Sequence, residues 1–229
     1  PADSEKDQTY FLHGISSSEL KKMIFPLAKL KKKDVRQLAH EHELISADKE
    51  ESQEICFVPR DYRQFLETQV SKPPSPGRFV DSYGNDLGRH EGLMYYTVGQ
   101  RRGLGISDTT PYYVIHLDAK NNEVVLGKKE DLYCSEVEVS DVNWVSVKPR
   151  KLPFSATVKL RYSHQETSAT IIPVHDHRVR IQLNLPQASV SPGQAAVFYE
   201  KDIVLGGGWI VSTTPLQKIF AENSLEIPA

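Results

Sequence analysis

The sequence predicts a mainly β protein with an N-terminal helical segment, a central β-rich domain and a small C-terminal β-barrel. Helical periodicity is confined to about the first 70 residues, a Pro-rich break follows at 72–77, and evenly spaced short strands begin near Val137. We therefore expect four parts: a helical segment at 1–70, a central domain at 71–137, a barrel at 138–218 and a tail at 219–229.

Three helices are expected in the first segment. Ser16 to Glu19 fits a capping box, and Pro26 should end the helix that it starts. A second helix should cover 34–44, and a third should begin near Pro59, whose fixed φ suits a first turn. The apolar positions at helical spacing are Leu20, Met23 and Ile24 in the first helix, Val35, Leu38, Ala39 and Leu44 in the second, and Tyr62, Phe65, Leu66 and Val70, which we expect to be buried, in the third.

Strands are expected after the Pro-rich break. The first follows at 79–81 with a turn at 83–85, and residues 112–117 and 123–126 form a hairpin through Asn121 and Asn122. In the barrel, apolar residues alternate at 156–162 and 179–185, and further strands at 194–200 and 202–205 are closed by the glycine run 206–208. Short strands with frequent turns are typical of a small barrel.

Composition excludes several classes of protein. The chain has 229 residues, a net charge of −2 and a globular content of apolar residues, so it is neither fibrous nor disordered. Its longest apolar runs are far shorter than the roughly 20 residues of a membrane span, and the N-terminus does not fit a signal peptide. Two cysteines cannot form a disulfide framework, which favours the cytoplasm. Because the chain lacks an initiator Met, we expect it to be a piece of a longer protein.

A local excess of positive charge lies within residues 20–36, where seven basic residues accompany one acid, Asp34. Such a stretch is either a phosphate-binding surface or a solvated helix face. Smaller basic spots occur at Arg101-Arg102 and at 148–151. The loop 99–106 holds three glycines, which either permit tight turns or shape a loop whose arginines contact phosphates.

The two cysteines differ in setting. Cys56 follows a charged loop just before an expected helix, where a thiol pKa can fall, so it is either a nucleophile or a small buried hydrophobe. Cys134 has no comparable setting and is expected to be structural. His175 and His177 lack partner ligands at familiar spacing, which favours a surface turn, and we expect no metal site.

Six separated motifs together resemble the tRNA-specific 2-thiouridylase family (MnmA/TrmU). The resemblance runs in the family's order from Lys6 to about Ile210. The motifs are KDQTYFL at 6–12, FPL at 25–27, KEESQEICFV at 49–58, GLMYYTVGQRRGLGI at 92–106, PGQAAVFY at 192–199 and LGGG at 205–208. The resemblance implies that the barrel is like one found in elongation factors.

The resemblance implies a chemical role for Cys56. It matches the family's second catalytic Cys, which carries sulfur as a persulfide, received from a sulfur-relay protein or a cysteine desulfurase. The family uses ATP to adenylate the C2 oxygen of the wobble uridine of tRNA, and the sulfur then replaces that oxygen. A second thiol releases the product and leaves a disulfide with Cys56.

The family's nucleotide-binding motif and first catalytic Cys do not occur in this sequence. The chain therefore resembles the C-terminal portion of such an enzyme, and we expect it to be inactive alone, with ATP bound mainly by the absent domain. The expected partners are tRNA and the sulfur donor, with no membrane. A non-enzymatic RNA-binding module is the main alternative, and a thiol redox or hydrolytic enzyme using Cys56 is a third.

The resemblance also implies a tRNA-docking surface. The matching positions are Lys6, Asp7 and Gln8 at the N-terminus and Arg161, Tyr162 and Gln194 in the barrel. These residue types suit the role, because Lys and Arg bind phosphates while Tyr and Gln stack on or hydrogen-bond to unpaired bases.

Overall fold

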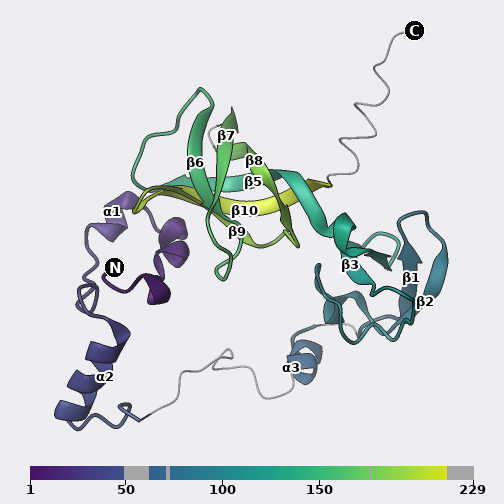
Figure 1. The fold of residues 1–229 in the computed structure, drawn as a ribbon, viewed down its shortest axis with the longest axis horizontal. Coiled ribbons are helices and arrows are strands. Elements are labelled where there is room, and N and C mark those ends of the chain that lie inside the picture. Colours follow the sequence, from purple (N-terminus) through teal and green to yellow (C-terminus); the bar gives the residue numbers. More distant parts are fainter. Residues whose placement is uncertain (49–61, 71–72, 176, 216–229) are drawn as a thin grey trace.

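A computed structural model describes residues 1–48, 62–70, 73–175 and 177–215 of the chain. An N-terminal helical segment, a small sheet and a β-barrel follow one another along the chain (Figure 1). The predicted fold class, mainly β with a helical beginning, is confirmed. Over these ranges no helix is both long enough and apolar enough to span a bilayer.

Six antiparallel strands close into the barrel in the order β10-β5-β8-β7-β6-β9. The strands are β5 (Tyr133–Trp144), β6 (Phe154–Lys159), β7 (Thr167–His175), β8 (Arg178–Ala188), β9 (Ala195–Glu200) and β10 (Ile203–Pro215). In β8, alternate residues Val179, Ile181 and Leu183 enter the core, as the pattern predicts. Leu185 continues the alternation in sequence but is 69% exposed, and it lies past Leu183, the last β8 residue paired with β7.

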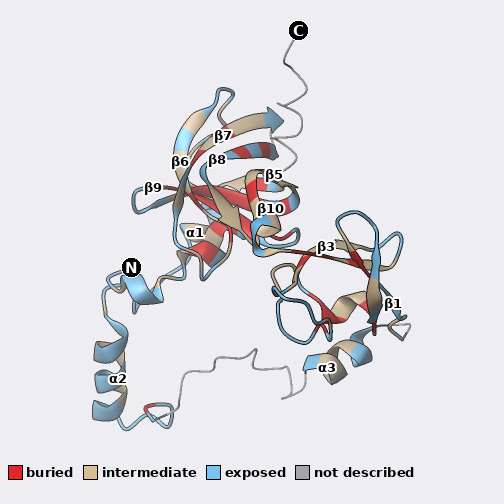
Figure 2. Ribbon diagram, turned by 45° about the vertical axis from the view of Figure 1, so that its right-hand side comes forward, coloured by how far each residue is buried: buried red, intermediate tan, exposed pale blue. Residues whose placement is uncertain are grey.

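Two barrel strands differ from the prediction. The strand expected at 156–162 ends at Lys159, because the backbone turns there and the N–H of His164 donates to the carbonyl of Arg161 at 3.2 Å. The first barrel strand, β5, begins earlier than the pattern indicated, at Tyr133. Figure 2 shows buried residues on the barrel strands and, as a second cluster, in the central unit.

The central sheet has the order β2-β1-β4-β3. Its strands are β1 (Gly77–Asp81), β2 (Asp86–His90), β3 (Tyr113–Asp118) and β4 (Glu123–Gly127), and the short 3-10 helices η3 (Leu93–Tyr95) and η4 (Lys129–Leu132) flank the second pair. The predicted β3–β4 hairpin is confirmed, and the sheet is mixed because β1 pairs with β4 in parallel.

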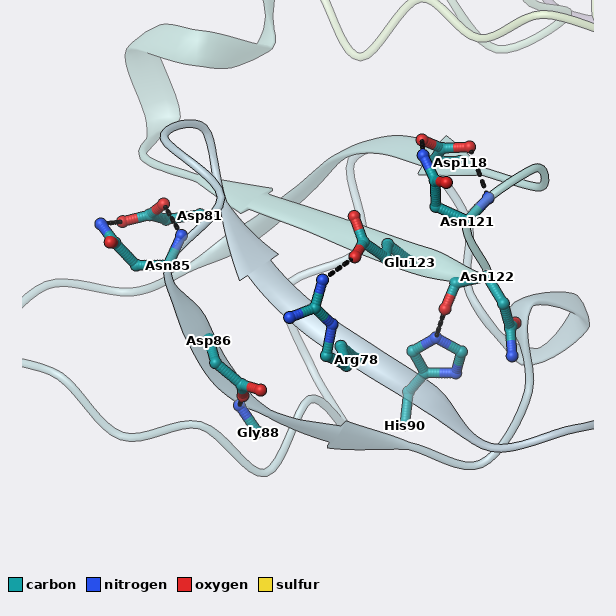
Figure 3. A network of polar contacts seen from close by, with 10 residues as sticks. All are labelled: Arg78, Asp81, Asn85, Asp86, Gly88, His90, Asp118, Asn121, Asn122 and Glu123. Carbon is teal, nitrogen blue, oxygen red and sulfur yellow. Dashed lines mark hydrogen bonds and ion pairs between the residues drawn. The ribbon is translucent and has the colours of Figure 1, made fainter.

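Aspartates shape both hairpin turns of this sheet (Figure 3). Asp81 accepts hydrogen bonds from Tyr83 and Asn85, and Asp118 accepts them from Lys120 and Asn121. Such Asx turns satisfy backbone donors that the ladder leaves unpaired.

The N-terminal segment is helical in short pieces. These are η1 (Ser4–Lys6), η2 (Thr9–Gly14), α1 (Ser17–Leu20), α2 (Lys32–Glu41) and α3 (Tyr62–Gln69). The Ser16 cap is confirmed, since its hydroxyl accepts from the N–H of Glu19 at 3.3 Å. The expectation that this helix reaches Pro26 is wrong. It ends at Leu20. Met23 and Ile24 are 42% and 87% exposed, so a further helical turn would have no surface to pack against.

The predicted burial of the third helix is wrong in part. Tyr62 and Val70 are 50% and 40% exposed, whereas Phe65 and Leu66 are half-buried. Polar contacts instead join α3 to the central sheet unit: the Tyr95 hydroxyl donates to Glu67 at 2.5 Å, and Arg63 pairs with Glu91 at 3.0 Å. Burial periodicity alone does not reveal such contacts.

Candidate nucleic-acid interface

The N-terminal segment lies against the outside of the barrel and carries the first three predicted site residues with it. The buried hydroxyl of Tyr10 donates to the carbonyl of Ala195 at 2.9 Å, and its ring packs on Ala195, Val197 and Tyr199. The Asn143 side chain in β5 donates to the carbonyls of His13 and Ile15 at 2.7 and 2.9 Å. The segment is thus fixed to the barrel by its own backbone and by one buried aromatic ring.

Gly207 explains why the glycine run is needed. A Cβ at this position would lie 2.8 Å from the Ala196 carbonyl oxygen and 2.9 Å from the Cβ of His13. Any side chain would therefore push the N-terminal segment off strand β10. The sequence predicted the glycines as the closure of a strand, and their contact with His13 becomes visible only in the fold.

Aromatic rings gather beside this contact. Tyr162 is 41% exposed and its ring centroid lies 4.8 Å from that of Phe11 and 6.0 Å from that of Tyr10. Phe11 is itself 56% exposed. Exposed rings of this kind are the platforms on which unpaired bases stack. Phe11 was not among the predicted site residues, although it lies in the same motif as Lys6, Asp7 and Gln8.

The structure brings Asp7 and Tyr162 together on one open cavity of about 410 Å³. Its lining includes both, together with Ser4, Glu5, Lys159, Ser163, His164, Gln165 and Glu166. The Asp7 carboxylate accepts from the N–H of Thr9 at 2.7 Å, so it also caps the start of η2. Burial lowers the pKa of His164, with a smaller contribution from the charge of Arg161.

The remaining predicted docking residues differ in exposure. Lys6 and Gln8 are exposed, as is Gln194, which precedes the Tyr10 acceptor Ala195. The backbone carbonyl of Gln194 accepts from the N–H of Ile210 at 2.8 Å.

Arg161 is half-buried and bound to protein groups. Its Nη2 donates to the Ser191 hydroxyl at 2.8 Å, to the Val98 carbonyl at 3.3 Å and to the Ser189 carbonyl. Burial lowers the pKa of this guanidinium, which Tyr10 partly offsets. Its environment is therefore unlike that of the exposed Lys6.

Cys56, the predicted persulfide carrier, lies outside the described residues. Cys134 is 4% exposed in the barrel core, and burial raises the pKa of its thiol to about 12. A thiol in this state is neutral at physiological pH and has little nucleophilic character. Its setting agrees with the structural role expected for it.

Two other sequence features have a clear setting. His175 ends β7 and Arg178 begins β8, so the histidine pair lies at a strand turn, and no group of three potential ligands for a metal is found among the described side chains. In the loop 99–106, Gly99, Gly103 and Gly105 have φ values of 92°, 74° and 68°, which favour glycine, while Arg101 and Arg102 are exposed.

The basic stretch is exposed throughout. Its members are Lys21, Lys22, Lys29, Lys31, Lys32, Lys33 and Arg36. The only described carboxylate inside it, Asp34, receives a hydrogen bond from the backbone of Lys31 at 3.3 Å. Both open interpretations, a phosphate surface and a solvated face, require this exposure.

Comparison with known proteins places the chain among proteins that combine three domain families. Residues 1–60 match the tRNA methyl transferase HUP domain, 63–128 the tRNA methyl transferase PRC-barrel domain, and 134–210 the aminomethyltransferase beta-barrel domain. The three matches are consecutive and follow the order of the helical segment, the central sheet and the barrel.

Curated relatives specify the family. The chain is 45% identical over 90% of its length to the tRNA-specific 2-thiouridylase MnmA of Acetivibrio thermocellus, 44% over 93% to that of Chlorobium phaeovibrioides, and 46% over 91% to that of Nostoc punctiforme. The chain belongs to the tRNA-specific 2-thiouridylase (MnmA/TrmU) family. It spans 58%, 61% and 59% of the length of these three relatives.

Proposed function

We propose that this chain is part of an enzyme that transfers sulfur to C2 of the wobble uridine of tRNA. The observation that carries the proposal is the 45% identity to a tRNA-specific 2-thiouridylase over 90% of the chain. Membership in the family supports a role in tRNA modification in general. The assignment of sulfur transfer to C2 rests on the motifs that resemble the family, above all the one that contains Cys56. We propose the cytoplasm as its location, where a free reactive thiol persists.

In the proposed reaction, Cys56 holds the transferable sulfur. ATP adenylates the uridine C2 oxygen and releases pyrophosphate. The terminal sulfur of the Cys56 persulfide attacks C2, and the oxygen leaves with AMP. A second thiol, in the domain expected to bind ATP, then attacks the Cys56 sulfur. It forms a disulfide and leaves the sulfur on the base, and an external thiol must reduce this disulfide before the next turnover.

The proposed tRNA surface combines the barrel and the segment docked on it. Lys6, Asp7 and Gln8 reach its edge from the N-terminal segment, Tyr162 offers an exposed ring, and Gln194 an exposed amide. We retain the expected division of the chain at 70, 137 and 218 as a proposal, with the barrel strand β5 extending back to Tyr133.

Persulfide formation tests the proposal most directly. After incubation with a cysteine desulfurase and cysteine, we expect an adduct of about 32 Da on the peptide that contains Cys56. Cys56→Ser should abolish the adduct and Cys134→Ser should leave it unchanged, because Cys134 is buried. An adduct that is absent from the native chain while tRNA still binds would favour the alternative, a non-enzymatic RNA-binding module.

Activity of the chain alone is the second test. With ATP, a sulfur donor and unmodified tRNA, we expect no 2-thiouridine in the digested tRNA, because the residues expected to bind ATP are not in this sequence. Detection of 2-thiouridine above a Cys56→Ser control would refute that expectation.

A further inference from the structure

Arg161 joins two parts of the molecule that are far apart in the chain. It follows strand β6 of the barrel, and its Nη2 contacts both the barrel loop between β8 and β9, at Ser189 and Ser191, and the carbonyl of Val98. Val98 belongs to the loop that leads from η3 of the central unit to β3. One guanidinium nitrogen therefore spans the junction between the barrel and the central unit.

Gly99, which follows Val98, shows how closely the barrel and the central unit approach each other. A Cβ at Gly99 would lie 2.6 Å from the Ser189 Oγ and 2.8 Å from the Ser189 Cβ, so a side chain there would force the two loops apart. The N–H of Gly99 donates to the Val114 carbonyl at 2.8 Å, and the N–H of Val114 donates to the Gln100 carbonyl at 2.9 Å. The loop is thus fixed to β3 on one side and to the barrel on the other.

The Arg161 guanidinium is held by neutral protein groups. The groups that Nη2 contacts are two carbonyls and one hydroxyl, all neutral, and Nε is buried with no partner in the described part of the chain. Partial burial of a cation is costly, and hydrogen bonds that fix a particular geometry offset the cost. Arg101 and Arg102, by contrast, are exposed and follow the junction directly.

We propose that Arg161 is a positioning residue, which holds the loop from Val98 to Arg102 on the barrel and thereby fixes Arg101 and Arg102 within the RNA-binding surface. The RNA part of this inference rests on the proposed function, whereas the loop contact does not. The glycine-rich loop then acts as a spacer of defined shape, and its two arginines make the phosphate contacts.

Proteolysis tests the loop contact without RNA. We expect Arg161→Gln and Gly99→Ala each to raise the rate of tryptic cleavage after Arg101 and Arg102 by about three- to tenfold, because both changes release the loop. Cleavage within α2 of the same molecule is the internal reference. Gly105→Ala is the matched control, since Gly105 also has a positive φ, of 68°, but no atom within 4 Å of its Cβ position.

Unchanged cleavage in a folded Arg161→Gln variant would overturn the proposal. Circular dichroism of each variant shows whether the barrel is folded. If Arg161→Gln unfolds it, Ser191→Ala decides instead, because it removes one acceptor of the Arg161 Nη2 and leaves the guanidinium in place.

A double-mutant cycle tests the RNA part. We expect Arg161→Gln to weaken tRNA binding roughly tenfold in the native chain but to have little effect when Arg101 and Arg102 are already Gln. Additive effects would mean that Arg161 contacts the RNA itself, which overturns the positioning role. If the native chain fails to bind tRNA at low salt, the proposed function is wrong, and the cleavage rates still decide whether Arg161 holds the loop.

Discussion

The thiol of Cys134 is kept neutral by its position in the barrel core. Its raised pKa of about 12 arises from burial, since no charged group contributes to the shift. A thiolate is the reactive form of cysteine, and at pH 8 a thiol with this pKa is ionised in roughly one molecule in 10⁴. The Cys134 thiol is therefore unsuited to the nucleophilic role that we propose for Cys56.

We predict that the Cys134 peptide stays unmodified when the native chain is treated with iodoacetamide at pH 8, and that it is alkylated once urea unfolds the barrel. Mass spectrometry of the digested protein measures the modified fraction. Rapid alkylation of Cys134 in the folded chain would show that the core opens at this point.

The raised pKa also has a consequence for stability. The thiol proton of Cys134 is bound more tightly in the folded state than in the unfolded state. Its contribution to the free energy of unfolding is therefore complete below the ordinary thiol pKa and is lost as pH rises toward 12. A Cys134→Ala variant should lose less stability between pH 9 and pH 11 than the native chain, as measured by urea unfolding.

The role of single residues was the part least open to prediction from local sequence. The residues flanking Cys56 are compatible with a nucleophile or with a buried side chain, and only the resemblance of the whole motif distinguishes the two. Phe11 was missed because its ring meets Tyr162 through a docking that depends on Gly207, and no local pattern encodes a contact over that separation.

At the scale of elements, one lysine fastens the long loop that precedes β3. The Lys128 ammonium donates to Asp108 at 2.6 Å and to the Thr110 carbonyl at 3.1 Å, and it lies 3.6 Å from the centre of the Tyr112 ring. The hydrogen bond from Lys128 is the main cause of the low pKa of Asp108, about 2. A carboxylate with a depressed pKa stabilises the folded state above its unfolded value of 3.8 and loses that contribution as pH falls toward 2.

We predict that Lys128→Met returns the pKa of Asp108 toward 3.8, as followed by carboxyl NMR titration. Asp118 is the control, because its lowered pKa arises chiefly from Asn121 and should not move. An Asp108 pKa that stays near 2 in the variant would mean that the backbone N–H of Thr109, rather than Lys128, is its main partner.

The docked N-terminal segment is the second element with a defined anchor. We predict that Tyr10→Phe lowers the free energy of unfolding by about 1–3 kcal/mol, because it leaves the buried carbonyl of Ala195 without its hydrogen bond. Urea unfolding followed by tryptophan fluorescence measures this, since Trp144 and Trp209 both lie on barrel strands. Tyr162→Phe, at an exposed ring, should change stability by less than about 0.5 kcal/mol.

Elements marked by turn residues or by an alternating pattern were predictable from the sequence. Element ends that depend on packing against distant residues were not. The β3–β4 hairpin has its turn residues in the sequence, and β8 shows its alternation directly. The ends of α1 and β6 depend instead on whether distant surfaces cover the next residues. Ile24 has no such cover, and beyond β6 the Arg161 side chain contacts two loops that the sequence does not place nearby.

On the scale of the whole molecule, the net charge of −2 conceals an exposed basic stretch in the N-terminal segment. Charges of this kind add salt-dependent affinity for a polyanion, because each neutralised phosphate releases counterions. The stretch would then add affinity to the proposed tRNA surface without adding sequence specificity.

We predict that changing Lys31, Lys32 and Lys33 to Gln weakens tRNA binding at low salt and reduces the slope of log affinity against log salt by about 0.7 for each phosphate that is no longer neutralised. The matched control replaces three exposed lysines outside the basic stretch, Lys120, Lys129 and Lys201, and should leave the slope unchanged. Equal slopes in the two triple variants would identify the basic stretch as a solvated face.

The order of the three units along the chain was largely predictable, because a change of periodicity and a Pro-rich break separate them. Their contacts with one another were not predictable. The sequence did not indicate which surface the helical segment covers. Its first part lies on the barrel through Tyr10, and α3 is bonded to the central unit through Tyr95.

The bond between Tyr10 and Ala195 also sets an order of events during protein synthesis. The two residues are 185 positions apart, and at ribosomal rates the acceptor is made roughly 10 to 40 s after the donor. Throughout that interval the Tyr10 ring has no barrel to cover it. Tyr10 therefore cannot dock until β9, which contains Ala195, has been synthesised. A nascent chain stalled before β9 would present an uncovered aromatic segment to chaperones and proteases.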